Sequence, residues 1–345
     1  MQVCQAAQGE FAFELTMAVA ASETIMRRRH FLTFAIGAFL SASPQAQQAG
    51  GLRRVGVLFP GVFGEEREKR LNEGLASELG TERVTVIIKS AAGDSQSLFK
   101  YARELVDSRV DVIVAIASGS LEAARRATQT IPIVALDLES DPIAIGAAQS
   151  LNRPGGNVTG VFFDAPEIAS KWIQIIRELV PQISHAGLLY DLHLDQTQVK
   201  AGETSAQKVG IATTLFGIDQ PGDFRSAFQR AVDAKVDAIL VHSSPIFVDK
   251  AAAIAEFARE FRLPSIGLFP IYAKVGGLIS YGPNNFDLMK QAGDMVGKVL
   301  RGQKAAELPI QRPIYVRFLI NLSTAKYLNL TVPASLSALA DEVIE

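Results

Sequence analysis

The chain has 345 residues, of which 48% are hydrophobic and 20% are charged, and its formal net charge is −2. This composition is typical of a compact globular protein, and such a near-neutral charge gives no electrostatic basis for binding nucleic acid. The only cysteine is Cys4, so the chain beyond it has no disulfide framework, thiol nucleophile or cysteine metal site.

An export signal is predicted to begin at Met26. Arg27, Arg28 and Arg29 precede an apolar stretch at 33–40 and a tail of small residues at 41–48. This order is typical of a cleavable signal, and Arg-Arg-x-Phe-Leu resembles the twin-arginine variant. The apolar stretch is shorter than the ~20 residues of a spanning helix, so a cleaved leader is favoured over a membrane anchor. Residues 1–49 are expected to be an upstream extension and this signal, and the mature protein is expected in the periplasm.

Short apolar runs alternate with amphipathic helical patterns from residue 53 onward. Strands are predicted at 54–59, 84–88, 111–117 and 131–136, with helices at 66–79 and 94–106 and a third beginning at 118–120. Continuous apolar strands that alternate with helices predict a parallel sheet covered on both faces.

A turn-rich break at 152–157 precedes a second series of the same kind. Strands are predicted at 158–163, 185–190, 211–216, 236–242, 263–268, 277–281 and 313–319, with helices at 167–180, near 196, 223 and 248, and at 286–300. We therefore predict an α/β protein with two doubly wound parallel-sheet lobes.

Ligands of open parallel sheets bind beyond the carboxyl ends of the strands. The loop Ser118-Gly119-Ser120 could hold an anion or could simply cap a helix. Asp137, Glu139 and Asp141 could meet a cationic group, or could serve only capping and solvation. The roles of two aromatic residues are undecided in the same way. Phe63 and Tyr281 could each line a ligand-binding cleft between the lobes, or could serve only for packing.

Signals of an enzyme are weak. His185, His193 and His242 have no metal-ligand spacing, and no Gly-x-Gly-x-x-Gly, Walker loop or Gly-x-Ser-x-Gly motif is present. No catalytic residue, cofactor or metal is therefore expected.

Several segments resemble one family of transport proteins. They lie at 150–160, 276–284, 308–310, 320–326 and 340–345. Together they resemble the tryptophan/tyrosine-type solute-binding proteins of ABC importers, over nearly all of residues 26–345. The loops at 190–193 and 242–245 depart from the pattern of amino-acid-binding relatives.

The resemblance implies a type I periplasmic-binding fold, with two lobes joined by a multi-strand hinge. The first lobe would comprise 50–161 and 283–307, and the second 162–282 and 308–345. The implied ligand-binding residues are Gly61, Phe63, Ser118, Gly119, Ser120, Asp137, Asp141, Asp191, Ser243, Ser244 and Tyr281.

The function expected from this resemblance is a receptor for a small organic solute, amino-acid-like or aromatic, which it delivers to a membrane permease. We expect a monomer with no nucleic-acid partner. Two alternatives stay open: an exported hydrolase with His242 or His193 as base, and a sensor that signals to a membrane partner.

Overall fold

The computed structural model of the protein describes residues 52–80 and 84–345. The predicted export signal at 26–48 lies outside the described residues, as does Cys4. All described residues belong to a single unit of the chain. No helix within this part of the chain is both long and apolar enough to cross a membrane.

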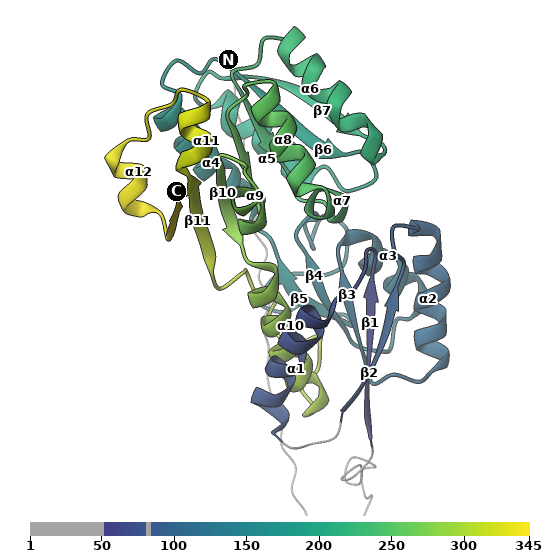
Figure 1. Cartoon of the computed structure of the whole chain (residues 1–345). Helices are drawn as coiled ribbons and strands as arrows, with labels where there is room; N and C mark the ends of the chain where they lie inside the picture. Colours follow the sequence, from purple (N-terminus) through teal and green to yellow (C-terminus); the bar gives the residue numbers. More distant parts are fainter. Residues whose placement is uncertain (1–51, 81–83) are drawn as a thin grey trace, which may run out of the picture. The chain divides into compact units, whose positions relative to one another are not determined.

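The first sheet consists of five parallel strands in the order β2-β1-β3-β4-β5 (Figure 1). The strands are β1 (Arg53–Phe59), β2 (Val84–Ser90), β3 (Val112–Ile116), β4 (Ile133–Asp137) and β5 (Val158–Phe162). Its helices are α1 (Glu65–Leu79), α2 (Ser95–Asp107), α3 (Ser118–Ala127) and α10 (Asn285–Leu300). Strands β3, β4 and β5 are buried along their whole length, as expected for a parallel sheet covered on both faces.

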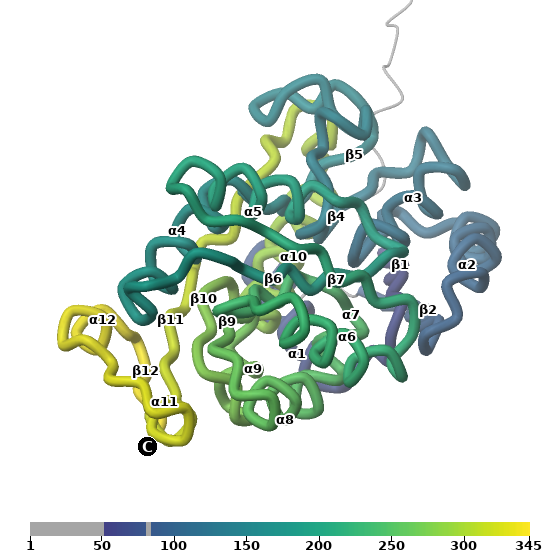
Figure 2. The backbone as a smooth tube through the Cα atoms, turned by 90° about the horizontal axis from the view of Figure 1, so that it is seen from above, coloured from purple at the N-terminus to yellow at the C-terminus, as the bar shows by residue number. Residues whose placement is uncertain are grey.

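The second sheet has the order β12-β11-β10-β9-β8-β6-β7 and is parallel except where β10 pairs with β11. Its strands are β6 (His185–Asp191), β7 (Ala212–Ile218), β8 (Ala238–Val241), β9 (Ser265–Gly267), β10 (Ile279–Pro283), β11 (Val316–Asn321) and β12 (Glu342–Ile344). Its helices are α4 (Ala165–Leu179), α5 (Thr197–Gln207), α6 (Phe224–Asp233), α7 (Pro245–Asp249), α8 (Ala251–Glu260), α9 (Pro270–Lys274), α11 (Leu322–Tyr327) and α12 (Ala334–Leu339), with a short 3₁₀ turn at Pro221–Asp223. Figure 2 shows β11, β12 and α12 together at one edge of this sheet.

The C-terminal part of the second sheet differs from the prediction. Strand β11 begins three residues later than expected, at Val316. The last residues form β12, a strand parallel to β11, where the sequence analysis recognised no element. Two short helices, α7 and α9, follow β8 and β9, and each has proline at its first position. Proline is favoured there because its missing N–H would have no helical partner. Only a loop was expected at α9, whereas the single helix expected near 248 is divided into α7 and α8.

The chain passes between the two sheets after β5, after β10 and again through residues 308–315. The Thr159 hydroxyl donates to the Leu308 carbonyl at 2.7 Å. The Phe162 N–H donates to the Gln311 carbonyl at 3.0 Å, and the Arg312 guanidinium donates to the Phe162 carbonyl at 3.2 Å. These bonds hold the first and third crossings side by side.

Helices α1 and α10 pack unusually closely against each other. A Cβ at Gly74 would lie 2.1 Å from the Lys290 carbonyl oxygen, and one at Gly293 would lie 2.3 Å from the Leu71 carbonyl oxygen. No real Cβ contact is this short, so both positions require glycine while the helices keep this separation. Glycine weakens an isolated helix by about 1 kcal/mol, and the close backbone packing of the pair offsets this cost.

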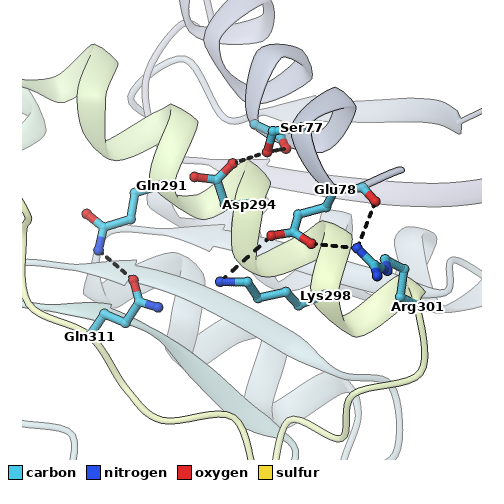
Figure 3. A network of polar contacts seen from close by, with 8 residues as sticks. Ser77, Glu78, Gln291, Asp294, Lys298, Arg301 and Gln311 are labelled. Carbon is cyan, nitrogen blue, oxygen red and sulfur yellow. Dashed lines mark hydrogen bonds and ion pairs between the residues drawn. The ribbon is translucent and has the colours of Figure 1, made fainter. Parts of the chain in front are cut away.

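Polar side chains border the same helix pair (Figure 3). The Ser77 hydroxyl donates to the Asp294 carboxylate at 2.5 Å, and Arg301 pairs with Glu78 at 3.0 Å. The Gln291 side chain of α10 donates at 2.8 Å to the side-chain oxygen of Gln311 in the third crossing. These contacts connect α1 to α10 and connect α10 to the hinge.

Candidate functional site

A cavity lies where the carboxyl ends of strands from both sheets meet. Its lining comes from the segments after β1, β3, β4, β8 and β9 and from the first turn of α10. The lining residues are Phe59, Arg67, Ile116, Ala117, Leu136, Leu138, Glu139, Ser243, Ser244, Pro245, Val248, Asp249, Phe269, Asn285, Leu288 and Met289. Most of these are apolar, and a few polar groups converge among them, as is typical of small-molecule sites.

Arg67, in the first turn of α1, supplies the cation of the cavity. Its guanidinium carbon lies 5.0 Å from the centre of the Phe59 ring, within the range of a cation–π interaction. Burial lowers the pKa of Arg67 from its ordinary value, and nearby Asp249 partly offsets that effect. Arg67 forms no salt bridge with another described residue, so the guanidinium can donate hydrogen bonds to an anionic group of a ligand.

Glu139 is the buried acid of the cavity, and only 5% of it is exposed. It accepts a hydrogen bond from the Ser243 hydroxyl at 2.8 Å and another from the Ser118 N–H at 3.2 Å. Ser118 belongs to the first sheet's α3 and Ser243 follows the second sheet's β8, so this carboxyl group joins the two lobes. Burial, and then the charge of Asp137, raise the pKa of Glu139 to about 8.

Asp137 lies behind Glu139 at the end of β4 and is fully buried. Its Oδ1 accepts the backbone N–H groups of Glu139 and Ser140 at 2.9 and 3.0 Å. Its Oδ2 has no hydrogen-bond partner among the described residues. Burial raises the pKa of Asp137 as well, against the opposing effect of the two N–H donors.

Gln198 of α5 makes a second polar link between the lobes. Its side-chain amide donates to the Leu138 carbonyl at 2.5 Å and accepts from the Ser243 N–H at 2.9 Å. Beside it, the Ser244 hydroxyl donates to Asp191 at 2.6 Å. The loop after β8 is therefore held both to its own sheet and to the loop after β4.

A sequence profile for ABC transporter substrate binding proteins matches residues 65–344. The chain belongs to this family. A tyrosine-binding protein from Clostridioides difficile is 26% identical over 251 residues, which are 72% of this chain and 72% of that protein. The ABC domain from Streptococcus pneumoniae solved with L-Trp is 27% identical, with a TM-score of 0.77 over 85% of this chain and all of that one. A conserved domain protein from Vibrio cholerae is 25% identical, with the same TM-score and coverages.

The fold class predicted for this substrate-binding protein is confirmed. The two parallel-sheet lobes match those of the solved relatives and have the type I periplasmic-binding fold. The family resemblance inferred from the sequence is confirmed too, because the profile covers most of the chain.

Two of the predicted ligand-binding residues, Ser243 and Ser244, line the cavity of the substrate-binding protein. Gly61 lies close to its wall, because a Cβ there would be 3.2 Å from the Phe59 ring. Phe63 packs edge-on against the same ring at 5.6 Å. Asp191 reaches the cavity only through Ser244, and Asp137 only through Glu139, as described above.

The other predicted residues lie elsewhere. Ser118 and Gly119 line a neighbouring depression with His193, although the Ser118 N–H bonds Glu139. Ser120 is buried. Asp141 accepts two backbone N–H groups of its own turn.

Tyr281 is separated from the cavity. It lines a depression beside β11 and packs edge-on against Phe318 at 5.9 Å. The Tyr281 side chain therefore packs against its own sheet in this structure.

The two histidines of the hydrolase alternative are not paired with a nucleophile. The His242 ring is buried against Trp172, with ring centres 5.7 Å apart, and its Nε2 has no partner among the described residues. His193 lies at the surface and pairs with Asp219 at 3.0 Å. In the part of the chain that the structure describes, no group of three or more potential metal ligands occurs.

Sequence reasoning missed Arg67, Asp249, Asn285 and Gln198 entirely. Arg67 stands among Glu65, Glu66 and Glu68 and looks like part of a solvated helix face. Glu139 was recognised as a residue of an important loop, but its burial could not be read from the sequence.

Proposed function

We propose that this protein is the solute receptor of an ABC importer, that it acts in the periplasm as a monomer, and that it releases its ligand unaltered to a membrane permease. The ligand would be a small organic solute with an apolar body and charged or polar ends. The observation that carries the proposal is the inter-lobe cavity, whose walls are apolar and whose polar groups are Arg67, Glu139 and Ser243.

The chemistry of the cavity fits an amino-acid-like or aromatic solute. Phe59, Phe269 and Leu288 offer flat and aliphatic surfaces to an apolar body, while Arg67 offers a positive charge to an anionic end. Two relatives support this class, since one is described as tyrosine-binding and another was solved with L-Trp. The ligand would bridge the lobes and shift the protein toward a closed conformation.

Calorimetry with L-tyrosine, L-tryptophan, L-leucine and benzoate, combined with small-angle scattering, tests this function. We expect saturable binding of at least one solute, with one molecule bound per chain and a smaller radius of gyration. Absence of binding and of compaction across the panel would refute the proposal.

A matched pair of variants locates the site. Val248→Trp places a bulky ring on the cavity wall and is expected to abolish binding. Val232→Trp places the same ring at an exposed position of α6, outside the cavity lining. This variant is expected to bind the solute as the wild type does. Equal binding by both variants would place the ligand outside this cavity.

A further inference from the structure

Glu139 in the cavity wall and Asp137 behind it form a pair of buried acids that has no cationic partner among the described residues. Glu139 and Asp137 are both buried, and neither forms a salt bridge with any described residue. The only partners of Glu139 that bridge the lobes are neutral, and Asp137 Oδ2 has no partner at all among the described residues. Two buried carboxylates side by side cannot both be ionised without a positive charge nearby.

The other charged and titratable groups around the pair do not supply that charge. Arg67 and Asp249 line the same cavity, from α1 and α7, but Arg67 forms no hydrogen bond or salt bridge with Glu139 or Asp137. Asp191 lies beyond Ser244 and adds a further acid. His242, next in the chain to Ser243, is buried and has its pKa lowered to about 4, so it is neutral at physiological pH.

We propose that Glu139 determines specificity by receiving a protonated amine of the solute, and that this ammonium group displaces a proton that Glu139 carries in the unliganded protein. This inference rests on the proposed receptor function and deepens it by naming a required group of the ligand. The loop after β8 offers the hydroxyls of Ser243 and Ser244, and Glu139 on the loop after β4 supplies the buried carboxyl group.

The exchange balances simply. The ligand enters as R–NH₃⁺ and keeps its three protons, Glu139 loses one O–H proton to solvent, and the resulting carboxylate accepts N–H donors from the ammonium group. Binding therefore releases about one proton wherever the pair is protonated in the unliganded protein. By linkage, affinity for such a ligand rises with pH, up to about tenfold per unit, and levels off near pH 8.

Calorimetry in two buffers of different ionisation enthalpy measures the released proton directly. The probes are L-tyrosine, L-tryptophan and L-leucine, each compared with its analogue in which hydrogen replaces the amino group. At pH 6.5 we expect close to one proton released per amine-bearing ligand bound. The analogues are expected to release none and to bind at least tenfold more weakly.

Two variants separate the role of Glu139 from general packing. Glu139→Gln keeps one side-chain oxygen for the Ser118 N–H and turns its amide N–H toward the Ser243 hydroxyl oxygen. It cannot release a proton, so proton release and the preference for amines are both expected to disappear. Asp233→Asn changes an exposed acid of α6 that does not line the cavity and is expected to keep both. Infrared spectroscopy of the unliganded protein adds a readout without ligand: the carbonyl band of a protonated carboxyl group at pH 6.5, absent in Glu139→Gln.

The outcomes separate this inference from the proposed function. Analogues that bind as tightly as the amines, with compaction but no proton release, would overturn the role of Glu139 while leaving the receptor intact. Binding of no probe would overturn both proposals. Proton release that persists in Glu139→Gln would place the exchanged proton elsewhere and would also overturn the inference.

Discussion

Burial of His242 is expected to make the protein less stable in mild acid. Only 6% of the residue is exposed, its ring lies against Trp172, and burial lowers its pKa from 6.5 to about 4. Between these pH values the unfolded chain binds a proton that the folded chain rejects. The free energy of unfolding therefore falls as the pH falls, and the contribution is fully present only above pH 6.5.

The magnitude follows from the difference in pKa between the folded and unfolded chains. Each unit corresponds to about 1.4 kcal/mol, so this imidazole removes ~3 kcal/mol of stability between pH 6.5 and pH 4. Glu139 acts in the opposite direction, because it keeps its proton in the folded chain up to about pH 8. Its contribution is present below its unfolded pKa of 4.5 and is lost as the pH rises toward 8. The two slopes partly cancel between pH 4.5 and 6.5, so the wild-type profile alone does not isolate either group.

Urea denaturation of wild type and His242→Leu at a series of pH values isolates the imidazole. Between pH 6.5 and 4 we expect the wild type to lose ~3 kcal/mol more than the variant, whatever the variant's absolute stability. His193→Leu serves as the control, because that histidine is exposed at the surface. Parallel pH profiles for wild type and His242→Leu would refute the reasoning, as would a His242 NMR signal that titrates near pH 6.5 in the folded protein.

Three further substitutions test other parts of the structure. Gly293→Ala is expected to lower thermal stability by about 1–3 kcal/mol, because its Cβ would lie 2.3 Å from the Leu71 carbonyl; a rise in melting temperature would contradict the close packing of α1 and α10. Ser243→Ala removes the hydrogen bond to Glu139, so scattering should show a larger radius of gyration without ligand, and an unchanged radius would argue against this link. Trp172→Phe removes the indole donor to a carbonyl of β10 and should cost ~1 kcal/mol or more in urea denaturation; unaltered stability would show that this bond contributes nothing.

The sequence was sufficient to predict most strands of the two sheets because these strands are continuous apolar runs bounded by turns. Such runs are required when both faces of a parallel sheet are covered, so β3 and β4 could be found from local pattern alone. The short helix α9 was missed, and α7 was not separated from the helix expected near 248, because five residues are too few to show a helical period.

The site was only partly predictable, since its links join residues that are distant in the sequence. Glu139 and Ser243 are 104 positions apart, and no local pattern shows that they meet. The rule that ligands lie at the carboxyl ends of strands selected both loops, and both line the cavity. Tyr281 was expected in the site from its position beside a break and from the family resemblance, but its antiparallel pairing with β11 takes it toward Phe318. Arg67 was missed because a cation among acids on a helix is usually a solvated residue.

The central claim, that two lobes move around a bound solute, is tested most directly by measuring a distance between them. Cysteines introduced at Glu122 on α3 and at Gln196 before α5, both exposed, can be labelled selectively in a chain that begins at residue 50, since Cys4 is the only native cysteine. Pulsed electron paramagnetic resonance then gives the distance with and without a solute shown by calorimetry to bind. We expect a broad distribution without solute and a narrower, shorter one with it. An unchanged distribution on saturation with that solute would contradict the account.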